Sequence, residues 1–413
     1  MGQDSEVDLL IVGGGLTGTS LAAELSARRP DLGIALVDAG RIASGASGRS
    51  GGQVLHWING IEPTNPDLAR RLWDVTGRGI DRVAAVQART DVGFARLGSL
   101  EVYTDQRRAA AAQERTERLI SWGVPVQWLD QTALRQRLVL AGAVGATFDP
   151  EAGRVNGVLL ARALVAEARS QGVQVFEGTR VTRIREGAVH EVETTGGTIR
   201  ARALVLATNG YTPGLGYFKT GLLALHSHVV ASPVLSPAEQ ARVGWADFAG
   251  FADDMDRIAY GSRSAGGRLV YGGGSNAAYD YLYGNRDTWP AGRAGGHPAV
   301  IRHLEQQFPA LGGAPPELAW TGTLGVTMDR MCAMGVQGDH QNVYYALGYS
   351  GHGLALAMLA GEVLADIYCG DGAQWSDLPF YNRRPGGIPP DPLRWIGYHL
   401  VTAATGKSPR RRA

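Results

Sequence analysis

The stretch from Val7 to Gly18 constrains the fold of this chain more than any other, because it joins an apolar strand, a glycine turn and the start of a helix. Residues 9–12 are all apolar, and glycines follow at positions 13, 14, 15 and 18. Gly13 allows a tight turn, Gly15 lets a phosphate approach the backbone, and Gly18 lets the helix pack closely on a sheet. The N-terminus of that helix offers N–H groups and a positive dipole end to the phosphates. The spacing predicts a βαβ unit that binds a dinucleotide.

The segment that follows supports this prediction. A second strand over residues 34–37 ends in Asp38, 20 residues after Gly18, where a carboxylate binds the hydroxyls of a ribose. The loop from Ser44 to Gln53 then consists almost entirely of small residues, with Arg49 as its one charged member. Such a loop is either a flexible surface segment or a backbone that a flat cofactor approaches closely. Its position directly after Asp38 favours the second interpretation.

Size and charge limit the possible classes of protein. A chain of 413 residues exceeds the usual single core of about 250–300 residues, so two domains are expected. The net charge of +1, without a basic stripe, argues against a nucleic-acid partner. Cys332 and Cys369 form no CxxC pair, which predicts neither a disulfide framework nor a metal site and favours a cytoplasmic location. The acidic N-terminus does not resemble a signal peptide, and no apolar run approaches the roughly 20 residues of a membrane span.

Two later segments also end at small turns. Residues 203–207 are continuously apolar, as in a strand buried within a parallel sheet, and lead into Thr208. Residues 343–347 predict a strand, Gly348 to Gly353 a turn, and residues 354–368 a helix. The positive end of that helix would stabilise an anionic reduced flavin. His352 in this turn is interpreted either as part of that site or as a polar residue that satisfies the helix start.

The remaining pattern predicts mixed elements. We expect helices over residues 66–86, 106–122, 155–170 and 300–308, and strands over 99–104, 173–176, 179–184, 188–194, 198–201, 226–235, 257–263 and 268–272. Aromatic residues are concentrated between residues 260 and 320, which indicates either ordinary sheet packing or an aromatic-lined substrate pocket.

Six motifs now point to a family. They are IVGGGLTGTSLAAEL, DAGRIASGASGRSGGQV, ALVLATNGYTP, GRLVYGGG, WTGTLGVTMDRMCAMG and NVYYALGYSGHGLALAMLAGEVLAD, which span about residues 7–370. The chain resembles the FAD-dependent amine and amino-acid oxidases of the D-amino-acid oxidase superfamily. Within it, the resemblance is greatest to the branch of γ-glutamylputrescine oxidase, glycine oxidase and sarcosine oxidase. GASGRSGGQ followed by GYSGHG is the selective combination.

The resemblance implies an α/β fold, in which a Rossmann-like FAD-binding domain carries an α+β substrate domain with an antiparallel sheet. The FAD-binding domain would comprise residues 1–80, 145–215 and 320–370. The substrate domain would comprise residues 81–144 and 216–319. Residues 371–413 would form a C-terminal helix and a basic tail.

The resemblance also implies site residues. The expected contacts to FAD are Gly13, Gly15, Leu16, Thr17, Gly18, Asp38, Ala39, Ser44, Ser47, Gly48, Gly51, Gly52, Gln53, Val181, Thr208, Gly348, Ser350, Gly351, His352 and Gly353. No acid–base residue is required for the chemistry, and the candidates for substrate contact are Arg49, Tyr260, Arg263 and His352.

The implied reaction is oxidation of a C–N bond in a small amine or amino acid. A hydride passes to flavin N5, the imine is hydrolysed, and the electrons pass to oxygen or another acceptor. Sarcosine oxidases have a lysine near the flavin that helps to activate oxygen, but this chain has no lysine between Lys219 and Lys407. A dehydrogenase with another acceptor therefore stays open, as do a flavin monooxygenase that uses NADPH and a cofactor-binding protein without turnover.

Two features predict that FAD is bound non-covalently. The loop after Asp38 has no histidine before His56, and Cys332 stands where the related pattern usually has proline.

The C-terminal stretch from Asp391 to Gly406 predicts an amphipathic helix, followed by a basic tail that we expect to be disordered. Leu393, Ile396 and Leu400 share helical spacing. The helix would lie either on a membrane surface or partner, or against its own domain. The second arrangement is the more common one, so we expect no membrane association.

Overall fold

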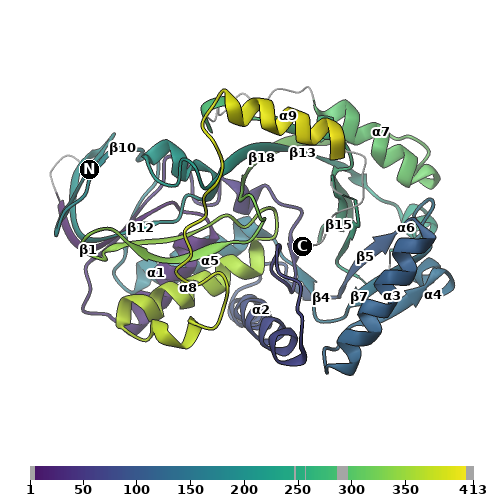
Figure 1. Ribbon diagram of the computed structural model, residues 1–413, viewed down its shortest axis with the longest axis horizontal. Helices are drawn as coiled ribbons and strands as arrows, with labels where there is room; N and C mark the ends of the chain where they lie inside the picture. The colour runs from purple at the N-terminus through teal and green to yellow at the C-terminus, as the bar shows by residue number, and fades with distance from the viewer. Residues whose placement is uncertain (1–4, 246–247, 256, 286–295, 406–413) are drawn as a thin grey trace.

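The computed structural model describes residues 5–245, 248–255, 257–285 and 296–405. Two large sheets form the framework of this part of the chain and lie side by side (Figure 1). The first sheet contains the N-terminal strand and is accompanied by α1, α2, α5 and α8. The second is accompanied by α3, α4, α6 and α7. The basic tail and Trp289 lie outside the described residues.

The first sheet has a parallel centre. Its strands in spatial order are β10 (Val181–Arg185), β11 (His190–Thr194), β12 (Gly197–Leu206), β1 (Ser5–Val12), β2 (Ile34–Val37) and β9 (Gln174–Phe176). In addition, β20 (Val343–Leu347) lies parallel to β12, and β19 (Ala333–Gln337) lies antiparallel to β20. The strands β9, β2, β1, β12 and β20 are mutually parallel, so their carboxyl ends lie at one edge.

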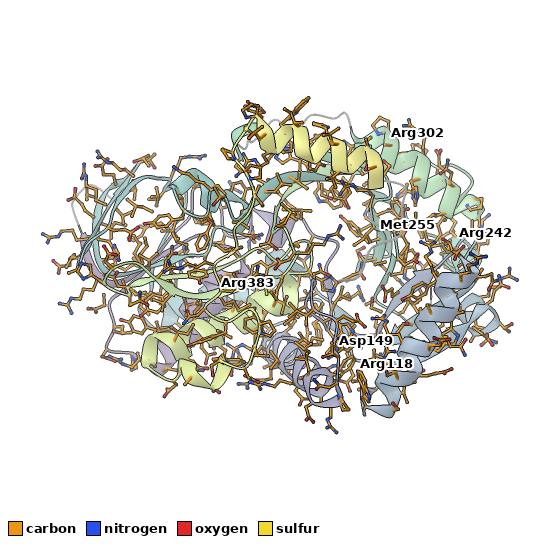
Figure 2. The ribbon with its side chains drawn as sticks, viewed as in Figure 1. Arg118, Asp149, Arg242, Met255, Arg302 and Arg383 are labelled. Carbon is orange, nitrogen blue, oxygen red and sulfur yellow. The ribbon has the colours of Figure 1, made fainter. Side chains whose placement is uncertain are left out.

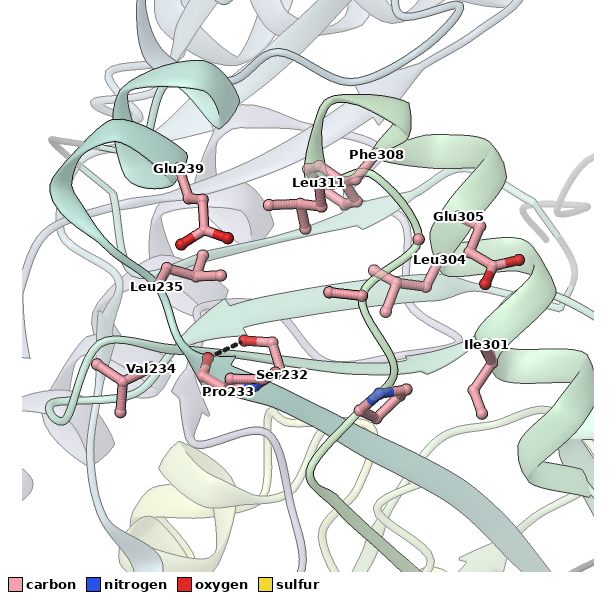
Figure 3. A pocket seen from close by; sticks show the side chains of 13 residues that line it. Ser232, Pro233, Val234, Leu235, Glu239, Ile301, Leu304, Glu305, Phe308 and Leu311 are labelled. Atoms are coloured by element: carbon pink, nitrogen blue, oxygen red, sulfur yellow. Dashed lines mark hydrogen bonds between the residues drawn. The ribbon is translucent and has the colours of Figure 1, made fainter.

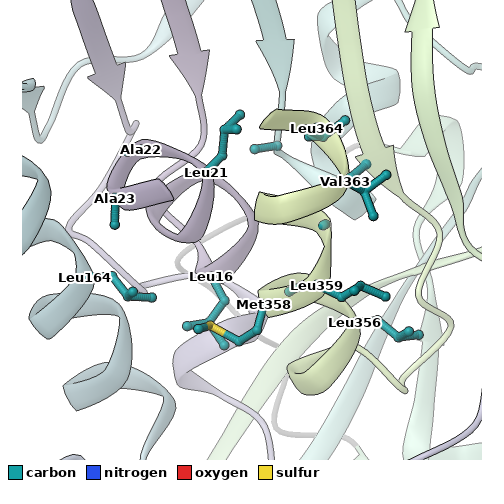
Figure 4. Close-up of a cluster of buried hydrophobic side chains, with 14 of the residues drawn as sticks. Leu16, Leu21, Ala22, Ala23, Leu164, Leu356, Met358, Leu359, Val363 and Leu364 are labelled. Atoms are coloured by element: carbon teal, nitrogen blue, oxygen red, sulfur yellow. The ribbon is translucent and has the colours of Figure 1, made fainter. Parts of the chain in front are cut away.

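Four helices accompany this sheet: α1 (Leu16–Arg28), α2 (Pro66–Gln87), α5 (Gly157–Ser170) and α8 (Leu354–Cys369). Of these, α2 packs mainly on α8. Apolar side chains of α1, α5 and α8 form a continuous core with those of β1 (Figure 4). The helices α1 and α8 approach closely, since the Ser20 hydroxyl donates to the Met358 carbonyl oxygen at 2.9 Å. A side chain at Gly361 would overlap Ser20. The glycine turns before α1 and α8 therefore lead into two helices that pack on each other.

The predicted elements of this half are confirmed, with small changes in their bounds. Asn65 caps α2 as its position before Pro66 suggests, accepting from the Leu68 N–H at 2.9 Å. One prediction was wrong: residues 198–201 and 203–207 form the single strand β12 instead of two strands. The reason is that β1 pairs with β12 along its length, from Ser5 opposite Ile199 to Val12 opposite Leu206.

The second sheet is mainly antiparallel. Its spatial order is β17 (Tyr279–Tyr281), β13 (Leu223–Val234), β16 (Arg268–Gly273), β15 (Ala259–Arg263), β14 (Gly250–Asp253), β5 (Ser99–Tyr103), β7 (Gly145–Asp149) and β6 (Gln127–Asp130), with β18 (Leu318–Val326) also on β13. Only β14 and β5, among the described pairs, are parallel. The accompanying helices are α3 (Gln106–Ser121), α4 (Gln131–Arg137), α6 (Pro237–Val243) and α7 (His297–Gln307). A small third sheet joins β3 (Gln53–Val54), β8 (Gly153–Arg154) and β4 (Ala95–Arg96).

The chain returns for the last time from the second sheet to the first through a short crossover. β18 ends at Val326 and β19 begins at Ala333. Arg383 fixes the crossover by donating to the Met331 carbonyl oxygen at 2.9 Å and to the Asp329 carboxylate at 2.7 Å (Figure 2). By sheet membership, β7 and β18 lie with the second sheet, although their residues fall largely in the ranges expected for the FAD-binding domain. The domain boundaries themselves stay a prediction.

The C-terminal helix α9 (Leu393–Thr405) lies above β13 and β18 in Figure 1. It packs on its own chain, as the favoured interpretation expects, but through polar contacts. Arg394 bonds to Tyr281 of β17 at 2.8 Å, and Thr402 accepts from Arg257 at 2.7 Å. Leu393, Ile396 and Leu400, which the amphipathic pattern singled out, are exposed.

Candidate active site

The predicted cofactor residues lie along the edge where the parallel strands end. Gly13 follows β1, Asp38 follows β2, Thr208 lies just beyond β12, and Gly348 follows β20. Direct contacts join the neighbouring strand ends. The Gly13 N–H donates to the Val37 carbonyl oxygen at 2.9 Å, and the Gly348 N–H donates to Asn209 Oδ1 at 2.9 Å. This edge is where ligands bind in open α/β sheets.

The turn between β1 and α1 requires its glycines. Gly13 has a φ of +114°, and a side chain there would approach the Ala207 carbonyl oxygen to 2.6 Å. A side chain at Gly18 would overlap the carbonyl oxygen of Gly13. Gly15 caps α1 without a side chain, so the positive end of this 13-residue helix faces the site through backbone alone. The Leu16 N–H already donates to Ser47 Oγ at 2.9 Å, which brings the following loop to the helix start.

Asp38 is held by two backbone donors. One carboxylate oxygen accepts from the Gly14 N–H and the other from the Gly40 N–H, both at 2.7 Å. Burial raises the pKa of this carboxyl, although the two amide donors oppose that shift. The carboxylate is therefore fixed beside the glycine turn. The Asp38 carbonyl oxygen also accepts from the Thr179 N–H at 2.7 Å, so Val181 at the start of β10 lies two residues beyond this contact.

The loop from Ser44 to Gln53 is anchored at Arg49. The Arg49 guanidinium donates to the carbonyl oxygens of Ser44 at 2.6 Å and Thr321 at 2.8 Å. The Trp320 indole donates in turn to the Arg49 carbonyl oxygen at 2.9 Å. The same loop contains the 3₁₀ turn η1 (Ala46–Gly48) and enters β3 at Gln53. Arg49 thus ties the loop to β18 of the second sheet.

The far end of this loop lies against β15. The Ser262 hydroxyl donates to the Gly51 carbonyl oxygen, and the Gln53 amide donates to the carbonyl oxygens of Phe251 and Gly261, each at 3.3 Å. The half-buried Tyr260 ring lies 3.4 Å from where a side chain of Gly51 would begin. Burial raises the pKa of Tyr260, so the phenol is neutral at ordinary pH. Tyr260 therefore lies at the junction of the cofactor loop and the second sheet.

The turn before α8 meets the first glycine turn. Tyr349 and Thr17 form a buried hydroxyl–hydroxyl hydrogen bond of 2.8 Å. The Ser350 N–H donates to the Gly325 carbonyl oxygen at 3.1 Å, and the His352 N–H donates to the Tyr349 carbonyl oxygen at 2.9 Å. Gly351 has a φ of +88° with no atom within 4 Å of the position of a side chain. Gly353 caps α8, again without a side chain, so a second helix N-terminus points to this region.

The remaining predicted residues divide into two groups. Gly48, Gly52 and Thr208 lie within the same network: a side chain at Gly48 would overlap Ala43, the Gly52 carbonyl oxygen accepts from Val155 at 2.8 Å, and Thr208 bonds Thr212 at 2.9 Å. Ala39 is exposed beside Asp38. Arg263, by contrast, donates to the Trp245 carbonyl oxygen at 3.0 Å, within the second half of the molecule.

The aromatic residues of the middle segment serve different purposes. Tyr271 is fully buried with Phe251 and Phe308, which is sheet packing. Tyr281 contacts α9, and Tyr283 is exposed. Tyr260 lies against Gly51, and Trp320 donates to Arg49, so both contact the loop from Ser44 to Gln53.

The contacts of Asn209, Tyr349 and Ser262 were not predicted. Asn209 and Tyr349 lie within turns that the sequence marked, beside Thr208 and Gly348, so their position was a usable signal. The sequence contained no comparable signal for Ser262, because its contact with Gly51 depends on how β15 packs against the loop from Ser44 to Gln53.

Other surface features do not coincide with this site. The pocket in Figure 3 lies between β13, α6 and α7 and is lined mainly by apolar side chains such as Leu235, Leu304 and Phe308. Within the described ranges, no group of three or more His, Cys, Asp or Glu residues is arranged to hold a metal ion. Nor does any described helix have the length and apolar character needed to cross a membrane.

Comparison with known proteins agrees with this geometry. Residues 8–367 match the family model described as "FAD dependent oxidoreductase". The chain is 30% identical over 395 residues to the gamma-glutamylputrescine oxidoreductase of Escherichia coli, covering 92% of this chain and 88% of the relative. It is 27% identical to the glycine oxidase of Geobacillus kaustophilus, covering 87% and 92%. The crystal structure of that glycine oxidase superposes with a TM-score of 0.77 at 24% identity, covering 93% of this chain and 100% of the other. The chain belongs to the FAD-dependent oxidoreductase family.

Proposed function

We propose that this enzyme oxidises the C–N bond of a small amine or amino acid to an imine, which water then hydrolyses. The similarity to a gamma-glutamylputrescine oxidoreductase and to glycine oxidases supports this substrate class. The observation that carries the proposal is the contact of Tyr260 and Ser262 with Gly51. This contact places β15 of the second sheet against the loop from Ser44 to Gln53. That loop follows Asp38, which lies at the end of β2 in the first sheet.

The residues that would bind FAD follow from the same edge. The glycine turn and the N-terminus of α1 suit the pyrophosphate, and Asp38 suits the ribose beside it. The loop from Ser44 to Gln53 would line the flavin ring, and the turn from Gly348 to Gly353 would lie at its pyrimidine edge. The N-terminus of α8, capped by Gly353, favours negative charge there.

Bound FAD supplies the hydride acceptor for this chemistry. The protein then has to orient the substrate carbon and keep its amine neutral. The neutral Tyr260 phenol suits orientation through a hydrogen bond, and His352 lies in the turn before α8. Arg49 already donates to one carbonyl oxygen of the loop and to one of β18. Its proposed role is therefore to hold the loop against β18, and not to contact the substrate.

We further propose that FAD is held without a covalent bond and that the enzyme works in the cytoplasm. Cys332 is buried, and burial raises the pKa of its thiol to about 12, so it is a poor nucleophile. Both cysteines of the described chain are free thiols, as expected in a reducing compartment.

An anaerobic titration tests the function. The visible absorbance of the purified holoenzyme is followed while amines, amino acids or NADPH are added separately. We expect an amine or amino acid alone to bleach the flavin, whereas bleaching by NADPH only would favour the monooxygenase. The reduced enzyme is then mixed with oxygenated buffer or an artificial dye, and the faster reoxidation identifies the class of electron acceptor.

A further inference from the structure

The helix α9 is oriented with its polar residues inward and its apolar residues outward. Arg394 and Thr402 are the buried side chains, at 6% and 7% exposure. Leu393, Ile396 and Leu400 are between 45% and 67% exposed. A surface helix of a globular protein normally buries its apolar stripe, so this arrangement requires a physical cause.

The cause is a polar network that fixes the inner face. The Arg394 guanidinium donates to Asp391 at 2.6 Å and to the Tyr281 phenol at 2.8 Å, and Asp391 also accepts from the Gly284 N–H at 2.6 Å. Near the other end, Thr402 accepts from Arg257 at 2.7 Å and from Asn276 at 3.1 Å. Turning the helix to bury its leucines would break both sets of contacts.

The outward face of α9 is rich in apolar side chains, with His399 as an exposed polar member beside Trp395. Leu393, Ile396 and Leu400 follow at i, i+3 and i+7, and Trp395 and Val401 flank them with 44% and 59% exposure. Of the 13 exposed large hydrophobic residues in the described chain, five therefore lie on this one helix. Clusters of this kind mark interaction surfaces, whereas isolated exposed apolar residues do not.

We propose that α9 docks this enzyme on an anionic lipid surface, which reverses the expectation from the sequence because the apolar residues of the helix are turned outward. The helix carries Trp, Leu, Ile and Val outward, which suits insertion into the boundary between head groups and acyl chains. The sequence that follows it contains Lys407, Arg410, Arg411 and Arg412 with no acidic residue. Basic residues that follow an interfacial helix in the sequence strengthen its binding to an anionic membrane. The apolar face and the adjacent charge therefore select the same partner.

A second copy of the chain fits this face less well. A helix of 13 residues is about 20 Å long, so its exposed side is far smaller than the ~800 Å² per partner of a stable dimer. Four like charges next to the helix would also repel each other across a symmetric pair. This inference concerns docking alone and does not depend on the proposed reaction.

Vesicle flotation tests the proposal with the full-length holoenzyme. Vesicles of phosphatidylcholine, with or without phosphatidylglycerol, are mixed with the wild type, with the double variant Ile396→Glu/Leu400→Glu, or with the triple variant Arg410→Gln/Arg411→Gln/Arg412→Gln. Leu159→Glu on α5 is the matched control, because Leu159 is an exposed leucine at 41% on another helix.

We expect the wild type and Leu159→Glu to float only with vesicles that contain phosphatidylglycerol. The glutamate pair should lower the partition coefficient by about tenfold or more, since it removes two apolar side chains from the lipid boundary. The arginine variant should lower the partition coefficient on anionic vesicles, and the partition coefficient that is left should no longer depend on the salt concentration. Retained flavin content and unfolding temperature show that each variant is folded. The proposal is overturned if the wild type does not float, if the glutamate pair floats equally well, or if sedimentation shows a wild-type dimer that the glutamate pair abolishes.

Discussion

The hydroxyl of Thr17 and the phenol of Tyr349 lie 2.8 Å apart in a buried position, although 332 residues separate them in the chain. Thr17 stands in the first turn of α1, and Tyr349 stands in the turn before α8. The bond therefore joins the two helix N-termini at the proposed FAD site. Burial raises the pKa of Tyr349, so the phenol is a hydrogen-bonding group and not an anion.

Tyr349→Phe should destabilise the protein and weaken FAD binding, because it leaves the buried Thr17 hydroxyl without this partner. We expect a loss of about 1–2 kcal/mol in the free energy of unfolding, measured by denaturant titration, and a several-fold higher Kd for FAD. A double-mutant cycle with Thr17→Val should give a coupling energy of about 1 kcal/mol. Strictly additive effects would show that the bond contributes nothing.

Gly18→Ala should abolish FAD binding, because the added methyl group overlaps the carbonyl oxygen of Gly13 and the backbone cannot move aside cheaply. The expected destabilisation is about 3 kcal/mol or more, measured by thermal unfolding. Gly397→Ala is the control: it is also a helical glycine, but no atom lies within 4 Å of the added group. That variant should be unchanged or slightly more stable, and equal losses in both would refute the steric argument.

Tyr260→Phe should lower kcat/KM by about tenfold through loss of one orienting hydrogen bond. The shape of the pH profile should not change, because burial raises the pKa of Tyr260 and its phenol stays neutral in the working range. Steady-state kinetics across pH would measure both. Tyr344→Phe on β20, a tyrosine that contacts Tyr368, should have no effect. A limb of the pH profile that disappears in Tyr260→Phe would instead identify Tyr260 as an acid or base.

Asp391→Asn should release α9. Burial alone would raise the pKa of Asp391, but Arg394, Tyr281 and the Gly284 amide together lower it. Because the pKa of Asp391 is lower in the folded protein than in the unfolded chain, its carboxylate stabilises the docked helix at pH values above its ordinary pKa of about 3.9. That contribution is lost as pH falls through the folded value.

Hydrogen exchange of the α9 amides would measure this release. The variant leaves Arg394 buried without its carboxylate, which costs about 3 kcal/mol, so exchange should accelerate by about a hundredfold at neutral pH. Asp377→Asn removes a carboxylate whose side chain is 54% exposed and which pairs with Arg71 on the surface. It should leave α9 unaffected, and an unchanged α9 in Asp391→Asn would contradict the network's role.

Acid precipitation of the holoenzyme should release all of its flavin into the supernatant, because the buried Cys332 thiol is unsuited to form a bond with it. Cys332→Ser should retain the same flavin content as the wild type, measured by absorbance after protein removal. Flavin that remains in the wild-type pellet but not in that of Cys332→Ser would establish a covalent link.

The sequence predicted the first sheet well because its signals are local. The apolar run of β1, the glycines before α1 and the turn before α8 each require a backbone conformation that few residues provide. The helix caps are local too, as Asn65 illustrates. Strand bounds were less accurate where a neighbour decides them, as β12 shows by running through the predicted break beside β1.

The substrate side was less predictable, since its contacts depend on the packing of distant strands. The aromatic residues between 260 and 320 have similar sequence surroundings, yet Tyr271 is buried in the core and Tyr260 reaches Gly51. Arg49 and Arg263 are equally plausible as substrate contacts in the sequence, but both donate to backbone carbonyl oxygens. Likewise, the amphipathic pattern of α9 indicates a helix without indicating which face is turned outward.

The six residues between β18 and β19 hold the end of the second sheet at a fixed distance from the first sheet. Thr327 bonds Met331 across this segment at 2.9 Å, Arg383 braces it, and Ser350 ties the turn before α8 to the end of β18. These contacts hold the end of β18 in the second sheet close to the turn that precedes α8. In the proposed reaction, this brace would keep the second sheet in one position relative to the flavin, so the distance over which a hydride travels would be the same for every substrate.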